Sequence, residues 1–270
     1  MDDHDVRQGS IDTLLHAPAE RGRVGLVARA SLAGRTSDSA FSRYLAAVDT
    51  AVDAHPPPFD APRYSAIYEQ ASADGHWLAI SLMTNAEREG DGAKRLWSLA
   101  ACATDPAQRA LLKKHAVDES RHALAYLTLL DLVFPGAVTP EFRAELDTLS
   151  PKFSMKQDVE AVPGSPYARV PELDDYVQMN IAEIRTTLHH LMQRHALQAH
   201  CPEDHWPRVQ RVLDSLLQDE LDHVGYTAEL IESLGGADAT GTDRMRALYA
   251  KRLDDFNAIT RDELERLVFD

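Results

Sequence analysis

Two five-residue stretches of this sequence carry side chains that could work together chemically. They are Asp118-Glu119-Ser120-Arg121-His122 and Asp219-Glu220-Leu221-Asp222-His223, each an Asp-Glu-x-x-His unit. On an α-helix, residues three positions apart share a face, so the glutamate and the histidine of each unit point the same way. A carboxylate beside an imidazole, presented twice, suits a pair of iron or manganese ions.

The repetition is the informative feature, because about one Glu-x-x-His is expected by chance in a chain of this composition. Here there are two, and an aspartate precedes each glutamate. The alternative is a pair of solvated helix faces with incidental histidines. The same faces carry the apolar residues Ala116, Ala123, Leu216 and Leu217, with Leu112 and Leu230 further along. The carboxylates therefore face an apolar interior, where a buried charge needs a partner or a metal.

A site for two metal ions also needs one carboxylate from each of two further helices. In an antiparallel helical hairpin, residues equally far from the turn lie level. Glu89 and Glu119 are equally far from Thr104, and Glu183 and Glu220 flank the Cys201-Pro202 turn in the same way. The sequence therefore predicts Glu89 and Glu183 as the remaining metal ligands.

Glu87 competes with Glu89 for the ligand position, because it lies only two residues away. The apolar stripe runs through Leu82, Ala86, Ala93, Leu96 and Ala100. That helical spacing includes position 89 and leaves out position 87, which favours Glu89. The other interpretation is that both glutamates are surface charges near Arg88.

Asp118 and Asp219 lie about 100° around the helix from the glutamates that follow them. Each could accept a hydrogen bond from a metal-bound histidine of the opposite motif and so fix the orientation of its ring. The alternative for both is a solvent-facing aspartate.

The elements that must position these residues are all predicted to be helices, and no strand alternation stands out. Residues 1–36 read as an irregular arm that contains Arg21, Arg23, Arg29 and Arg35. Helices are predicted over residues 37–54, 62–103, 106–134, 171–199, 202–235 and 242–268. Asp105 is expected to cap the helix that begins at Pro106. Residues 135–171, with six prolines, are predicted to be a long connection.

The predicted architecture is all-α, a four-helix bundle with a long crossover and extra N- and C-terminal helices. We divide the chain into an N-terminal arm and helix (1–61), the di-metal bundle (62–235) and a C-terminal helix packed on the bundle (236–270). The three parts are expected to form one domain.

Composition narrows the classes of partner and compartment. The formal net charge is −15, which disfavours nucleic acid as a partner even though the arm is basic. Cys102 and Cys201 show no zinc or iron–sulfur spacing and no disulfide framework, which fits a reducing cytoplasm. We expect no signal peptide and no membrane span.

The pattern formed by Glu89, Glu183 and the two Asp-Glu-x-x-His units resembles the ligand pattern of ferritin-like di-iron carboxylate proteins. That group includes multicomponent monooxygenases, the small subunit of ribonucleotide reductase, N-oxygenases, rubrerythrins and ferritins. The resemblance covers about residues 62–235. The double motif is a specific signal for the superfamily, but it does not distinguish one member from another.

The resemblance draws attention to two further residues. Thr187, one turn after Glu183, matches a threonine near the oxygen site of the hydrocarbon monooxygenases, but a helical threonine can also bond back to a carbonyl. Tyr126, one turn after His122, resembles the radical tyrosine position of the reductase subunit, although a core tyrosine is the favoured interpretation. From helical spacing alone, His190 and Asn180 share the face of Glu183, where they could line a substrate pocket, add a ligand or be core residues.

The resemblance implies that two iron ions, with manganese as the other option, activate dioxygen as a co-substrate and oxidise a small organic molecule. The expected reaction is C–H hydroxylation or desaturation, or amine N-oxygenation. Electrons would come from a separate reductase or from the substrate, and the resemblance also suggests a homodimer. The alternatives are a ferroxidase, iron-handling or peroxide-scavenging protein, and a di-iron radical generator.

Overall fold

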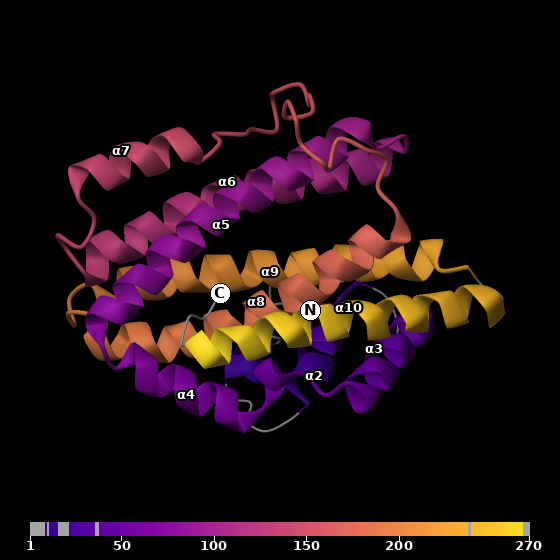
Figure 1. Ribbon diagram of the computed structural model, residues 1–270, viewed down its shortest axis with the longest axis horizontal. Helices are drawn as coiled ribbons and strands as arrows, with labels where there is room; N and C mark the ends of the chain where they lie inside the picture. The colour runs from indigo at the N-terminus through magenta and orange to yellow at the C-terminus, as the bar shows by residue number, and fades with distance from the viewer. Residues whose placement is uncertain (1–8, 10, 16–21, 36–37, 237–238, 267–270) are drawn as a thin grey trace. The chain divides into compact units, whose positions relative to one another are not determined.

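The structure is a computed structural model, and it describes residues 9, 11–15, 22–35, 38–236 and 239–266. Within these residues every regular element is helical, so the all-α prediction is confirmed there. The elements follow one another as α2 (Arg23–Ala30), η1 (Asp38–Phe41), α3 (Ser42–Ala54), η2 (Pro58–Asp60), α4 (Pro62–Ser72), α5 (Gly75–Cys102), α6 (Pro106–Val133), α7 (Pro140–Leu149), α8 (Leu173–His200), α9 (Trp206–Leu234) and α10 (Ala239–Arg266). Figure 1 labels them in this order.

The described chain forms two compact units. The first takes in the described residues up to Ala71, Glu172–His195 and the described part of Leu213–Phe269. The second takes in Ser72–Pro171 and Ala196–Val212. One motif therefore lies in each unit, and the predicted boundaries at residues 61 and 235 stay a prediction.

In the second unit, α5 and α6 form an antiparallel hairpin and pack along their length (Figure 1). Asp105 caps α6 as predicted, since its Oδ1 accepts the backbone N–H groups of Ala107 at 2.7 Å and Gln108 at 3.1 Å. Pro106 occupies the first turn, where a missing N–H costs nothing. The predicted apolar stripe of α5 is buried in full.

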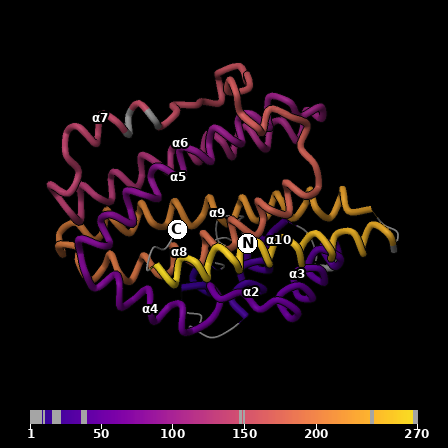
Figure 2. Tube along the Cα trace, in the orientation of Figure 1, coloured from indigo at the N-terminus to yellow at the C-terminus, as the bar shows by residue number. Residues whose placement is uncertain are grey.

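The crossover contains one helix that the sequence analysis missed. Helix α7 begins after Thr139, whose hydroxyl accepts the backbone N–H of Phe142 at 3.2 Å. The rest of the connection runs beside α5 and α6 (Figure 2). It is fixed there by Phe153, which stacks on Trp97 with ring centroids 4.2 Å apart, and by Lys113, which donates to the carbonyl of Met155.

The prediction of one helix over residues 62–103 is wrong. The chain breaks between α4 and α5, because the Asp74 side chain accepts the backbone N–H groups of His76 at 2.9 Å and Trp77 at 3.5 Å. This capping geometry starts a new helix at Gly75. The sequence signal was present, since an Asp-Gly pair punctuates the helical pattern at this point.

The prediction that residues 1–36 are irregular is also wrong over α2. Asp60, remote in sequence, accepts the backbone N–H groups of Gly22 at 2.8 Å and Arg23 at 3.0 Å, and so caps this helix. The arginines of the arm form ion pairs within the first unit: Arg29 with Asp49, and Arg35 with Asp222 and Glu229. Arg21 lies outside the described residues.

The remaining helix ends differ by a few residues from the predicted ones. Helix α9 begins at Trp206 rather than at Pro202, and it stops before Gly235 as expected. The predicted first helix is a 3₁₀ turn followed by α3, and its expected start at Ser37 lies outside the described residues, as does the expected end of the last helix at Val268. Such shifts at helix ends are ordinary.

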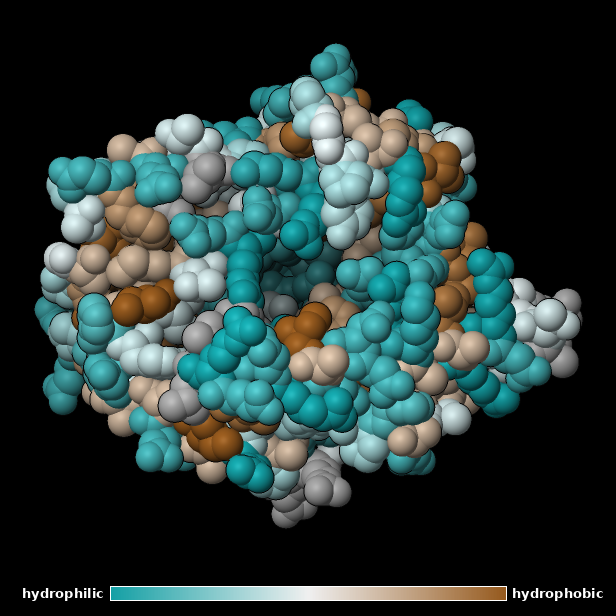
Figure 3. Space-filling view, viewed as in Figure 1, coloured by the Kyte–Doolittle hydropathy of each residue, from teal (hydrophilic) through white to brown (hydrophobic). Residues whose placement is uncertain are grey.

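Hydrophilic side chains cover much of the face shown in Figure 3, with apolar residues scattered among them. Among the described residues, no helix is both long enough and apolar enough to cross a lipid bilayer.

Candidate metal centre

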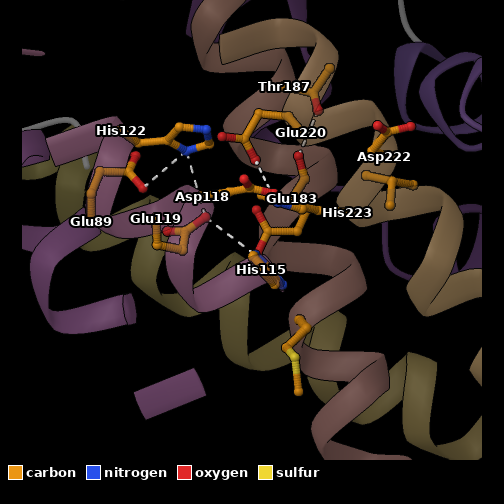
Figure 4. A network of polar contacts seen from close by, with 12 residues as sticks. Glu89, His115, Asp118, Glu119, His122, Glu183, Thr187, Glu220, Asp222 and His223 are labelled. Carbon is orange, nitrogen blue, oxygen red and sulfur yellow. Dashed lines mark hydrogen bonds and ion pairs between the residues drawn. The ribbon is translucent and has the colours of Figure 1, made fainter. Parts of the chain in front are cut away.

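The hairpin of α5 and α6 brings Glu89, Glu119 and His122 together (Figure 4). His122 Nδ1 lies 3.7 Å from Glu89 Oε2 and 3.6 Å from Glu119 Oε1. Ligand atoms of all three residues lie within 4.8 Å of one another, and the three residues are at most 9% exposed. Glu89 and Glu119 therefore lie level in the hairpin, as expected from their equal separations from Thr104.

The structure separates the two competing glutamates of α5. Glu89 is buried on the face that packs against α6, whereas Glu87 is exposed. Only Glu89 is placed where it could share a metal ion with the first motif.

The Glu119 carboxylate lies close to the backbone of Gly92, where a larger residue would place its Cβ atom. A Cβ atom at position 92 would lie 3.1 Å from Glu119 Oε2, tighter than about nine in ten real Cβ contacts. A side chain there would push the carboxylate by a few tenths of an ångström, so the glycine suits this position of Glu119.

His115 also contacts the carboxylate of Glu119, and the sequence analysis missed it. Its Nε2 lies 3.2 Å from Glu119 Oε1, and the residue is 1% exposed. The signal was available, because positions 115, 119 and 122 follow the i, i+4, i+7 spacing of one helix face. The Glu-x-x-His pattern does not include His115, which lies one helical turn before Glu119.

Asp118 is buried and accepts from two cations of its own helix. Lys114 Nζ lies 2.7 Å from Oδ2, and Arg121 Nη2 lies 3.0 Å from Oδ1. Both cations are more than half exposed, so this buried carboxylate is paired with groups at the protein surface. Its predicted bond to a histidine of the other motif stays a prediction, as does that of Asp219, which is half-buried.

Helices α8 and α9 build a second cluster within the first unit (Figure 4). His223 Nδ1 lies 3.5 Å from Glu220 Oε2. Ligand atoms of Glu183 and His223 lie within 4.8 Å of each other, and so do those of His190 and Glu220. Glu220 and His223 are almost completely buried, while Glu183 is half-buried.

All four proposed pocket residues are buried. His190 is part of the second cluster through its closeness to Glu220, and its role there stays a prediction. The hydroxyl of Thr187 donates to the carbonyl of Glu183 at 2.7 Å, which is the back-bonding expected of a helical threonine. Tyr126 is a buried residue of α6.

Asn180 is a structural junction of the first unit. Its Oδ1 accepts from the hydroxyls of Tyr44 at 3.1 Å and Tyr249 at 2.9 Å, and its Nδ2 donates to the Val224 carbonyl and to Thr227 Oγ1, both at 3.0 Å. Burial raises the pKa of both phenols, so they stay protonated and act as donors. The amide joins α3, α8, α9 and α10, and this explains its burial.

Arg35 binds the outer side of the second motif. Its guanidinium contacts Asp222 at 3.3 Å and Glu229 at 2.9 Å. A Cβ atom at Gly225 would collide with this side chain and with the carbonyl of Ser31. The arm therefore packs directly on the turn of α9 that follows the motif.

The chemistry of the donors fits a metal site. Each unit holds two carboxylates and two imidazoles, and most of these side chains are buried. Oxygen and imidazole ligands of this mixture suit iron or manganese and provide no thiolate for softer metals. The described structure thus contains one candidate metal-binding cluster in each unit.

No family model, curated protein or solved structure matches this chain.

Proposed function

We propose that this protein is a non-haem di-iron oxygenase or oxidase that acts on a small organic molecule. The observation that carries the proposal is the buried carboxylate–histidine cluster built by each of two helical hairpins around a repeated Asp-Glu-x-x-His unit. In this proposal the two hairpins form a ferritin-like four-helix bundle, and the clusters are the two halves of one site.

Glu89, Glu119 and His122 would hold one ion, and Glu183, Glu220 and His223 the other. Two ferrous ions, when bound, supply electrons to dioxygen and thereby an oxidant for the substrate. The protein's own contribution is to hold the donors in place and to keep water away from them, since most of them are buried. Gly92 leaves room for the Glu119 carboxylate.

The substrate would be oxidised at a C–H carbon or at an amine nitrogen. Electrons would come from a separate reductase or from the substrate, because the sequence has no flavin or dinucleotide pattern of its own. A homodimer in the cytoplasm is part of the same proposal.

The decisive test is an anaerobic titration with ferrous iron followed by admission of oxygen. We expect two irons per chain and a transient visible absorption band in the wild type. Glu119→Ala and His223→Ala should each lose at least one iron, whereas the surface variant Asp91→Ala should keep both. Rapid growth of a ferric core without a transient band would instead indicate iron storage. Absence of iron binding, or unchanged iron content in both cluster variants, would refute the proposal.

A further inference from the structure

The turn of α9 that carries His223 is held by hydrogen bonds from three side chains, and one of these belongs to the N-terminal arm. We infer that this arm residue, Arg35, is a positioning residue for the second cluster. By fixing the backbone at Asp222, it sets how firmly Glu220 and His223 hold their metal ion. The inference rests on the proposed function, and it gives the N-terminal arm a part in binding one of the two ions.

The first support is the way in which the backbone around His223 is held. A carbonyl oxygen has two lone pairs, so a helical carbonyl can accept a side-chain hydrogen bond besides the one from the helix. The His223 carbonyl accepts from Thr227 Oγ1 at 2.7 Å. The Val224 carbonyl accepts from Asn180 Nδ2 at 3.0 Å. These two donors come from α9 itself and from α8, and the carbonyl that precedes them accepts from the arm.

Arg35 supplies that bond and grips one face of α9. Its Nη2 donates to the backbone carbonyl and to Oδ1 of Asp222, each at 3.3 Å, and its Nη1 donates to Oε1 of Glu229 at 2.9 Å. Its Nε donates to the Ser31 carbonyl at 3.1 Å, which holds the side chain against the arm. Asp222 and Glu229 lie about two helical turns apart on the same face. A planar guanidinium that bonds both residues therefore fixes the position of this face.

The second support is the close approach of the arm at Gly225. A Cβ atom at this position would overlap the Arg35 side chain and lie 2.7 Å from the Ser31 carbonyl oxygen. The backbone of α9 therefore meets the arm with no side chain between them, two residues after His223. The side chain of Arg35 is only 19% exposed, so water screens its contact with Asp222 only in part.

The third support is the link between this contact and the metal ligands. Asp222 and His223 are adjacent in sequence, so a backbone fixed at the first residue also fixes the second. The ring of His223 and the carboxylate of Glu220 are almost completely buried, and His223 Nδ1 lies 3.5 Å from Glu220 Oε2. Groups that orient metal ligands in this way affect affinity without touching the ion.

The positive charge of Arg35 acts in the opposite sense to this positioning. A cation near the cluster repels a divalent metal ion, so loss of the charge alone would tighten metal binding. Loss of the positioning contact would weaken it. The direction of the change therefore tells the two effects apart.

The test compares Arg35→Gln with the wild type, with Arg43→Gln as the matched control. Arg43 binds Glu232 of α9 at 2.8 Å and the Glu232 carbonyl at 3.0 Å, so it makes the same kind of contact further from the motif. Anaerobic titration gives the stepwise dissociation constants for Fe²⁺. We expect Arg35→Gln to weaken one ion by roughly tenfold, the low end of the usual 10–100-fold effect of such groups, and to leave the other unchanged. The control should match the wild type.

A second variant separates geometry from charge. Arg35→Lys keeps the positive charge, but a single ammonium group does not reproduce the guanidinium contacts to Asp222 and Glu229. We expect it to weaken the same ion as Arg35→Gln does. If Arg35→Gln does not fold, Asp222→Asn tests the contact from its other side and should weaken that ion in the same direction.

The outcomes separate this inference from the proposed function. Two irons per chain in the wild type with unchanged constants in Arg35→Gln would overturn the inference and leave the di-iron proposal standing. Tighter binding in Arg35→Gln, or full recovery in Arg35→Lys, would show that charge acts and position does not. Equal weakening in Arg35→Gln and Arg43→Gln would reduce the contact to a general structural one.

The reaction with oxygen is scored separately from binding. A wild type that binds two irons but does not react with oxygen would overturn the proposed oxygenase, while the titration of Arg35→Gln would still decide the inference. A wild type that binds no iron would overturn both.

Discussion

At the scale of single residues, Glu119 is surrounded on several sides by groups of its own hairpin. Two imidazoles approach one of its oxygens, and Gly92 leaves room for the other. Its position is thus set by neighbours within its own hairpin. Such surroundings decide how well a carboxylate is presented to a metal.

The two helical glycines of α5 offer a matched pair for testing this. Gly92→Ala should weaken iron binding, in the roughly 10–100-fold range that disturbing a ligand through its surroundings costs. Gly90→Ala is the control, because its Cβ would meet Ser150 at an ordinary 3.6 Å. Both changes favour the helix by up to about 1 kcal/mol, so helix propensity cancels in the comparison. Equal iron affinity in the two variants, measured by anaerobic titration, would contradict the proposed role of Gly92.

The neighbouring glutamates of α5 give a second pair. Glu89→Gln should reduce the iron content of the protein, because it removes a buried carboxylate of the cluster. Glu87→Gln should leave the iron content unchanged, since Glu87 is exposed. Metal analysis after gel filtration measures both. A loss of iron in the Glu87 variant alone would reverse the assignment.

At the scale of elements, capping decides where the helices that carry the site begin. Asp74 starts α5 and Asp105 starts α6, each by accepting two backbone N–H groups. These caps fix the residues at which α5 and α6 begin. Glu89 lies on the first of these helices and Glu119 on the second. The hairpin therefore depends on local hydrogen bonds as well as on its apolar seam.

Removal of the cap at α5 should lower the free energy of unfolding. We expect Asp74→Ala to cost about 1 kcal/mol, the usual value for an N-cap aspartate. Asp91→Ala is the control, because Asp91 is exposed and pairs only at 3.5 Å with Lys94, a kind of surface contact worth less than about 0.5 kcal/mol. Urea unfolding followed by circular dichroism measures both variants. Equal costs for the two would show that Asp74 does not start the helix.

At the scale of the whole molecule, one cluster lies in each of the two compact units. Ions that bind only the folded protein stabilise it by mass action. Because most of the cluster residues are buried, unfolding must release any ion they hold.

Iron should therefore raise the thermal midpoint of unfolding. At a free Fe²⁺ concentration 100 times the dissociation constant, each bound ion should add about 2.7 kcal/mol of stability. Calorimetry without oxygen, before and after chelation, measures this effect. The double variant Glu119→Ala/His223→Ala should show no such shift. A midpoint that chelation leaves unchanged in the wild type would argue against structural coupling of the metal.

The sequence alone determined the features that depend on local spacing. The helical class, the Asp105 cap, the stop at Gly235 and the shared face of each Glu-x-x-His unit follow from helix periodicity and capping chemistry. The level pairing of Glu89 with Glu119 also followed, because the turn between two helices fixes which residues meet. These features need no knowledge of distant parts of the chain.

Only the tertiary structure decided the features that depend on remote partners. Helix α2 begins where it does because Asp60, remote in sequence, caps it. The side chain of Asn180 accepts hydrogen bonds from tyrosines of α3 and α10. The choice between Glu89 and Glu87 rested on burial, and burial depends on everything that packs around a residue. Helical spacing marks the face on which His115 lies, but only side-chain packing brings its ring to the oxygen of Glu119 that His122 also approaches.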